Sequence, residues 1–237
     1  MRQPSRQRVA EVWLATPDAA TRFDPSSLPE AERAEWAVLR TERRRRDWAS
    51  SRALRGAVPN AGDHSHSLSH SHGYAALAFA SGAVAVGVDL EKLVPRDFLG
   101  MARLTFAPEE AEWLADTHDP VERCSRFYEL WTLKEAFAKA LRLPLVDALR
   151  HCRFADSDRV GFSLVPAAGC WRATVFAPRF DLRLAFVRVA DTDDLLATAV
   201  GTAEWPSPRT VDWRVARSLG GGEIVPGCVI TCAPLLP

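Results

Sequence analysis

The feature that most constrains the fold is a long amphipathic stretch from Val121 to Leu141. Its apolar residues recur at the spacing of one helical face: Phe127, Leu130, Trp131, Leu133, Phe137 and Leu141. Pro144 follows and predicts where the helix ends. A stripe this broad has to be buried against other elements, and the neighbouring segments are short and strand-like.

Four segments alternate in polarity as strands do, at residues 8–14, 159–165, 171–177 and 182–189. Two more apolar runs, 73–80 and 83–91, are separated by Ser81-Gly82, which predicts a β-hairpin. Helical and strand patterns are therefore mixed along the chain. We expect an α/β fold.

Further helical patterns occupy residues 28–58, 97–104 and 109–116. We expect the first of these helices to break once near the arginine run 43–46. The segment 59–72 is polar, small and turn-rich, so it predicts a loop. Residues 191–237 contain Pro206, Pro208, Pro226 and a Gly-Gly-Gly run, which predicts loose structure or a segment packed across the body.

The chain contains a weak internal echo, because residues 29–36 resemble residues 108–113. One repeat after about 80 residues predicts two related α/β halves, since a solenoid needs at least three copies. Coincidence in an Ala/Glu/Arg-rich sequence is the alternative. We expect an N-terminal half at 1–82 with a short loop before its last strand, a C-terminal half at 83–190, and a tail at 191–237.

Composition narrows the class of protein. The 237 residues are 47% hydrophobic, with 30 basic and 30 acidic side chains, which excludes a disordered or fibrous chain. Zero net charge argues against nucleic acid or an anionic membrane as partner. We find no secretory signal or apolar run long enough to span a bilayer, and five scattered cysteines favour the cytoplasm.

Two carboxylates lie at the end of a predicted strand, in Gly87-Val88-Asp89-Leu90-Glu91. Side chains alternate along a strand, so Asp89 and Glu91 point to the same side and repel unless something positive lies between them. One interpretation is a solvent-facing strand end, with Glu91 paired to Lys92 or an arginine. The other is a hard divalent cation, most simply Mg²⁺.

The long helix carries a third acidic residue. Trp131, Glu135 and Lys139 recur every four residues and share one face. An ordinary Glu–Lys pair would explain this, but the face adjoins the apolar stripe, where an unpaired carboxylate is costly. Glu135 as a third metal ligand, with Lys139 meeting a phosphate, accounts for both. Lys134 lies about 100° around the helix and would serve a neighbouring phosphate or solvent.

The segment Ser67-Leu68-Ser69-His70-Ser71-His72-Gly73 enters a predicted strand. Four of the six histidines lie within nine residues, at His64, His66, His70 and His72. Zinc is one interpretation, although the spacing matches no common structural zinc site. Hydrogen bonding of the serines and histidines to a phosphate is a second, and a solvated loop without function is a third.

Taken together and in this order, three motifs resemble the Sfp-type 4′-phosphopantetheinyl transferases. They are Ser-His-Ser before a strand, Gly-Val-Asp-Leu-Glu, and Phe-Tyr-x-Leu-Trp-x-x-Lys-Glu-Ala-x-x-Lys. The likeness covers residues 67–145, with weaker likeness over 28–58. It implies a pseudo-dimer of two α/β halves with the active site between them. It also implies transfer of phosphopantetheine from coenzyme A to a serine of an acyl or peptidyl carrier protein, by a monomer.

The resemblance implies roles for particular residues. Asp89, Glu91 and Glu135 match the family's Mg²⁺ ligands, and Lys139 matches a lysine that contacts the phosphates. Glu135, or a water that it orients, would be the base that deprotonates the carrier serine. Glu110 lies near an acidic position of the family and would assist.

The resemblance also implies how coenzyme A is held. Ser69 and His70 match positions that hold its 3′-phosphate, with Lys134 available to a neighbouring phosphate. The family adds basic residues from the first helical region, for which the candidates are Arg40, Arg44 and Arg52. The chain departs from the family between Arg52 and Ser69, where it is shorter and lacks a Gly-Lys-Pro segment.

Two other readings of the chain remain open. One is a non-catalytic relative that binds coenzyme A or a carrier protein, which the shortened segment favours. The other is an unrelated metal-dependent enzyme that handles phosphates. Carrier proteins are acidic, so Arg123, Arg126 or the run 43–46 would meet one electrostatically, unless these arginines form an ordinary solvated face.

Overall fold

The computed structural model describes residues 10–58, 65–80, 85–151, 170–190, 213–219 and 230–232. The first part contains β1 (Ala10–Ala15), η1 (Pro17–Arg22), η2 (Pro25–Ser27), α1 (Glu30–Val38), α2 (Glu42–Ala57), β2 (Ser65–Ser71) and β3 (Tyr74–Ala80). The second contains β4 (Ala85–Lys92), α3 (Phe98–Thr105), α4 (Pro108–Ala115), α5 (Pro120–Leu141), α6 (Leu145–His151), β5 (Cys170–Phe176) and β6 (Leu182–Ala190). β7 (Trp213–Leu219) and β8 (Ile230–Cys232) follow.

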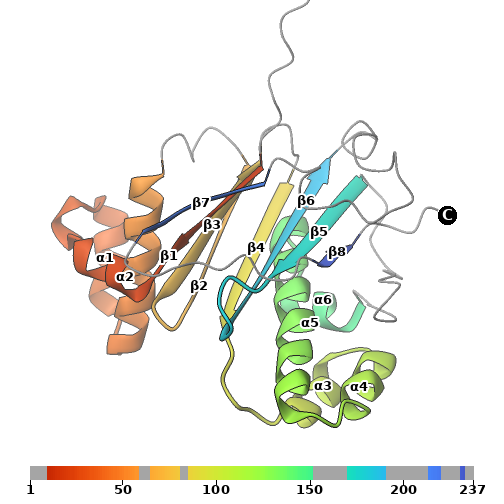
Figure 1. Ribbon diagram of the computed structural model, residues 1–237. Helices are drawn as coiled ribbons and strands as arrows, with labels where there is room; N and C mark the ends of the chain where they lie inside the picture. The colour runs from red at the N-terminus through yellow and green to blue at the C-terminus, as the bar shows by residue number, and fades with distance from the viewer. Residues whose placement is uncertain are drawn as a thin grey trace, which may run out of the picture.

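The strands form two four-stranded sheets, with orders β2-β3-β1-β7 and β4-β6-β5-β8. Pairing is antiparallel except between β1 and β7, which run parallel. The two sheets lie side by side, with α2 against the first and α5 along the second (Figure 1). The expected α/β fold is confirmed.

Buried apolar side chains pack between the two sheets and also between each sheet and the helix that covers it. One buried cluster combines Val12 and Ala78 of the first sheet with Val88, Leu90 and Phe186 of the second. A larger cluster lies between α5 and the second sheet, and a smaller one lies between α2 and the first. The strand β4 therefore takes part in the core between the sheets while α5 covers its own sheet.

Local signals explain where α5 begins and ends. The side chain of Asp119 accepts a hydrogen bond from the backbone N–H of Val121, and Pro120 occupies the first turn, where its missing N–H costs nothing. At the other end Arg142 adopts a left-handed conformation with φ of 53°. The N–H of Leu143 then reaches back to the carbonyl of Ala138, which closes the helix.

Most predicted elements are found within a few residues of their expected positions, but two expectations are wrong. The runs 73–80 and 83–91 form β3 and β4, which belong to different sheets and are not a hairpin. The hairpin partner of β3 is β2, in a segment that we expected to be a loop. The turn between them is made by His72 and Gly73, both with positive φ, a conformation that glycine tolerates best.

Smaller differences concern the first helical region and the C-terminal part. The helix breaks between Val38 and Glu42, before the arginine run, and Thr41 caps α2 by accepting from the N–H of Arg44. The strand predicted at 159–165 lies outside the described residues. Within 191–237, β7 pairs with β1 and β8 with β5, so loose structure is wrong for these two strands.

Candidate metal centre

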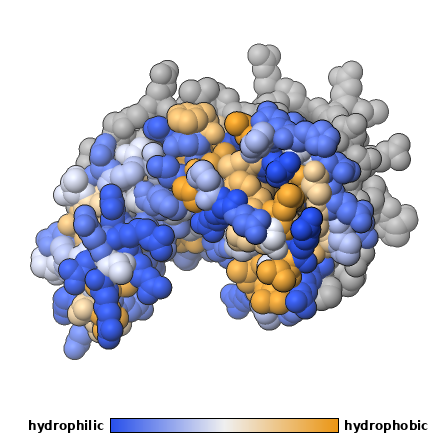
Figure 2. Space-filling view, turned by 90° about the horizontal axis from the view of Figure 1, so that it is seen from below, coloured by the Kyte–Doolittle hydropathy of each residue, from blue (hydrophilic) through white to orange (hydrophobic). Residues whose placement is uncertain are grey.

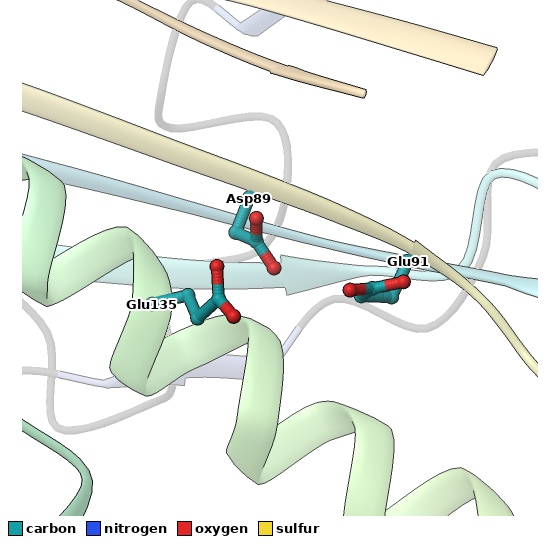
Figure 3. A group of neighbouring side chains, drawn as sticks. All are labelled: Asp89, Glu91 and Glu135. Atoms are coloured by element: carbon teal, nitrogen blue, oxygen red, sulfur yellow. The ribbon is translucent and has the colours of Figure 1, made fainter. Parts of the chain in front are cut away.

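Three carboxylates converge at the contact between β4 and α5. Asp89 and Glu91 come from the strand and Glu135 comes from the helix, and one oxygen of each lies within 4.8 Å of the others. Figure 3 shows the three side chains extending into the same space between strand and helix. Alternation along β4 and the position of Glu135 on α5 thus produce the cluster that the two motifs predict.

A glycine allows the strand and the helix to approach so closely. A Cβ added to Gly87 would lie 1.9 Å from the carbonyl oxygen of Ala136 and 2.7 Å from the backbone nitrogen of Ala140. Both contacts are with helix backbone, which cannot rotate away. Ala136 follows Glu135 and Ala140 follows Lys139, so this close approach sets the height of both functional side chains above β4.

Lys139 lies directly over Asp89. Its Nζ donates to Oδ1 of Asp89 at 2.8 Å, to the carbonyl of Val88 at 3.1 Å and to Oγ of Ser69 at 3.1 Å. Asp89 is 2% exposed, and its Oδ2 is buried with no hydrogen-bond partner among the described residues. A buried oxygen of this kind needs a partner, and a cation is one that its carboxylate would attract.

The carboxyl groups are difficult to ionise together. Burial and the negative charge of Asp89 together raise the pKa of Glu91 to about 7. Burial also raises the pKa of Glu135 to about 7, with Asp89 and Glu91 adding to the effect and Lys139 opposing it. A divalent cation would relieve this repulsion, because it favours the charged form of all three.

Two serines of β2 contact the acidic cluster. Ser69 Oγ donates to Oδ1 of Asp89 at 2.8 Å, and Ser71 Oγ donates to Oε2 of Glu91 at 2.7 Å. Ser69 is 6% exposed, and its one hydroxyl hydrogen is directed at Asp89. The hydroxyl of Ser69 thus already has a carboxylate partner, and the expectation that it holds a 3′-phosphate stays a prediction.

His70 points away from the cluster on the neighbouring position of β2. Its side chain is exposed overall, yet enclosure by the protein lowers the pKa of the imidazole, and Lys139 and Arg52 lower it further while Asp47 opposes them. The ring thus lies within electrostatic reach of a cation from each half of the chain. That position suits contact with an anion.

The three candidate arginines differ in their surroundings. Arg52 stacks over the ring of Trp48 at 4.3 Å and pairs with Glu32 at 2.5 Å. Arg40 and Arg44 are exposed, the first between α1 and α2 and the second in the first turn of α2. Of the three, Arg52 is the one whose charge acts on His70.

Lys134 and Glu110 form a buried ion pair. Nζ of Lys134 lies 2.8 Å from Oε2 of Glu110 and donates to the carbonyl of Leu149 at 2.9 Å, and the two side chains are 0% and 1% exposed. Glu110 also accepts from the N–H of Ala107. Lys134 therefore has no contact with solvent. The roles expected for Lys134 toward a phosphate and for Glu110 in assisting a base stay predictions.

Figure 2 shows a broad hollow between two lobes of the molecule. The lobe of α1 and α2 is mainly hydrophilic, whereas the facing lobe of α3 to α5 carries apolar surface. The strand β4, which supplies two of the carboxylates, lies between these lobes (Figure 1). Among the helices that the structure describes, none has the length and apolar character needed to cross a bilayer.

Comparison with known proteins identifies the class of this region. Residues 85–187, from β4 to β6, match the family model of the 4′-phosphopantetheinyl transferase superfamily. This segment, which contains all three carboxylates, is a domain of that superfamily.

One curated relative makes the likeness more specific. The chain is 36% identical over 85 residues to a Synechocystis sp. protein named "Putative 4'-phosphopantetheinyl transferase slr0495". The aligned part is 35% of this chain and spans about a third, 34%, of the relative's length.

Sequence reasoning missed the structural roles of Gly87, Ser71 and Asp47. Gly87 and Ser71 were inside recognised motifs, but nothing local shows that one meets a helix and the other a carboxylate. Asp47 is buried in α2 and accepts from the N–H of Gly73, which ties the helix to the β2–β3 turn. An acidic residue directly after an arginine run was the signal available in the sequence.

Proposed function

We propose that this protein transfers the 4′-phosphopantetheine group of coenzyme A to a serine of an acyl or peptidyl carrier protein. The observation that carries the proposal is the convergence of Asp89, Glu91 and Glu135 within the segment that matches the transferase superfamily. The product left behind would be adenosine 3′,5′-bisphosphate. We further propose a cytoplasmic monomer in which residues 1–82 and 83–190 act as two halves around one site.

The residues present fit Mg²⁺. The donor set consists of carboxylate oxygens, which hard divalent cations prefer, and the buried Oδ2 of Asp89 lacks a hydrogen-bond partner in the described structure. Asp89, Glu91 and Glu135 would hold the ion. Once bound, it would neutralise charge on the pyrophosphate of coenzyme A.

The chain's own residues supply the remaining chemistry. The carrier serine oxygen forms a bond to the β-phosphorus while the bond from that phosphorus to the bridging oxygen breaks. Glu135, or a water that it orients, would accept the serine proton. Lys139 is about one-third exposed, at 32%, so its ammonium can meet phosphate charge.

Contacts to the 3′-phosphate fall to the neighbouring basic groups. His70 and Arg52 lie close enough to interact electrostatically, and a charged guanidinium binds phosphate well. Arg40 and Arg44 are exposed on the same lobe. We propose Arg52 as the principal contact, since it is the arginine that acts on His70.

The test is transfer itself. The full chain is incubated with coenzyme A, Mg²⁺ and a panel of apo carrier proteins, and the intact mass of each carrier is measured. We expect a mass increase of one phosphopantetheine group on at least one carrier, and loss of the increase with Asp89→Ala and Glu135→Gln. Glu122→Gln is the matched control, because it makes the same change at an exposed position of the same helix.

The outcomes separate the proposed enzyme from its alternatives. Transfer that persists in Asp89→Ala or Glu135→Gln contradicts the role of the carboxylates. Calorimetry that detects coenzyme A binding without any mass shift across the panel would identify a non-catalytic binder instead. Neither binding nor transfer would leave an unrelated phosphate-handling enzyme as the better reading.

A further inference from the structure

The edges of the two sheets are joined by a row of three serines on β2. We name Ser67, Ser69 and Ser71 the serine row. Their Oγ atoms accept from the backbone N–H groups of Val88 at 3.0 Å, Leu90 at 3.2 Å and Lys92 at 3.3 Å. The two residues of each pair are 21 positions apart, so β2 and β4 run in the same direction. The serine hydroxyls occupy the positions that backbone carbonyls of a neighbouring strand would occupy.

The two-residue periods of both strands explain this arrangement. β4 is an edge strand whose other side pairs with β6, so every second N–H points outward and needs an acceptor. The side chains of β2 also alternate, which presents a serine at every second position. The serine row therefore satisfies the outer edge of β4 without a continuous sheet.

Two members of the row do more than accept. A serine hydroxyl has one hydrogen to donate, and Ser69 donates it to Asp89 while Ser71 donates it to Glu91. Ser67 makes the same backbone contact, and no carboxylate contact of its hydroxyl is seen among the described residues. The row thus contains two serines that touch the acidic cluster and one that provides a comparison.

These bonds constrain the carboxylates in a defined way. The hydroxyl of Ser69 and the ammonium of Lys139 both bind Oδ1 of Asp89, which leaves Oδ2 directed elsewhere and without a hydrogen-bond partner in the described structure. Ser71 holds Oε2 of Glu91 in the same manner. One oxygen of each carboxylate is thereby tied to the first sheet.

We infer that Ser69 and Ser71 are positioning residues that orient Asp89 and Glu91 for a divalent cation. This inference rests on the metal centre of the proposed function and deepens it. Groups that hydrogen-bond to metal ligands fix their orientation, and their loss reduces metal affinity by about 10- to 100-fold in other proteins. It follows that part of the cation site is held by β2, in the half of the chain that supplies none of its ligands.

The test uses Mn²⁺, which is another divalent cation that takes oxygen ligands. Mn²⁺ is titrated into the full chain, and the electron paramagnetic resonance signal of free Mn²⁺ measures how much is bound. We expect Ser69→Ala and Ser71→Ala each to weaken binding about tenfold. Ser67→Ala loses the same kind of backbone contact and should change the affinity less than twofold. Ser71→Thr keeps a hydroxyl and should retain most of the affinity.

Thermal unfolding of every variant distinguishes positioning from general damage. The inference is supported if Ser67→Ala and Ser69→Ala lose thermal stability equally while, of these two, only Ser69→Ala binds Mn²⁺ more weakly. If the wild-type chain binds Mn²⁺ and all three alanine variants bind it equally well, the inference is overturned and the metal centre stands. If the wild-type chain binds no Mn²⁺, the metal centre fails and the inference falls with it. Should Ser69→Ala not fold, Ser71→Ala and Ser71→Thr decide between the same outcomes.

Discussion

Gly87→Ala is the substitution that tests most directly how the acidic cluster is assembled. The new methyl carbon would lie 1.9 Å from the carbonyl oxygen of Ala136, whereas an ordinary contact begins at 3.4 Å. The helix α5 and the strand β4 must therefore separate by about 1.5 Å at this point. Because the atoms involved are backbone, a change of rotamer cannot relieve the contact.

The separation should affect stability and metal binding together. Overpacking of a well-packed core costs about 1–3 kcal/mol, and a clash with backbone falls at the upper end of that range. At about 2–4 °C per kcal/mol for a chain of this size, we expect a loss of about 6–12 °C in Tm. Glu135 moves with the helix while Asp89 stays on the strand, so Mn²⁺ affinity should fall at least about tenfold.

The assays are thermal and urea unfolding, with Mn²⁺ titration of the folded variant. Gly56→Ala is the matched control, because a Cβ at that helical position would meet nothing within 4 Å. Alanine is favoured over glycine inside a helix by about 0.5–1 kcal/mol, so the control should be unchanged or slightly more stable. Wild-type stability and metal affinity in Gly87→Ala would refute the close approach as the feature that sets the site.

Two further predictions follow from the titrating and buried groups. Glu91 and Glu135 have pKa values of about 7 without metal. The folded protein therefore holds more protons than the unfolded chain between about pH 4.5 and 7. Because of this difference, the free energy of unfolding of the metal-free protein should fall as pH rises through that range. Protons compete with the cation there, so Mn²⁺ affinity should rise at least about tenfold from pH 6 to pH 8; a flat profile contradicts these pKa values. Glu110→Ala removes the carboxylate paired with the buried ammonium of Lys134 and should cost about 3–5 kcal/mol in urea unfolding. Adding Lys134→Met to it should restore most of that loss, and a double variant no more stable than the single one would contradict the pairing.

Local periodicity carried the prediction of the acidic cluster. Alternation along a strand places Asp89 and Glu91 on one side, and the four-residue spacing of the long helix places Glu135 in line with Lys139. The fold class was predictable for the same reason, since the apolar stripe of 121–141 and the strand patterns at 171–177 and 182–189 are properties of neighbouring residues.

The same local reasoning failed where the answer depended on a distant partner. Ser81-Gly82 predicts a turn between two strands. The local sequence does not show whether the second strand pairs with the first or belongs to another sheet. In the structure, β4 pairs with β6. The segment before Gly73 looks like a polar loop, yet its serines are hydrogen-bonded to β4. The segment is a strand because its backbone pairs with β3, and its serine hydroxyls find their donors on the other sheet.

What the sequence determined by itself is the set of groups and their local spacing: three carboxylates, a lysine one turn from the third, and a glycine ahead of the first. Only the tertiary structure decided which of them meet. The contact of Gly87 with the backbone of α5 brings Glu135 to the strand, and Glu110 encloses Lys134 in place of solvent. Periodicity acts within one element, whereas burial and charge pairing depend on elements that lie far apart in the chain.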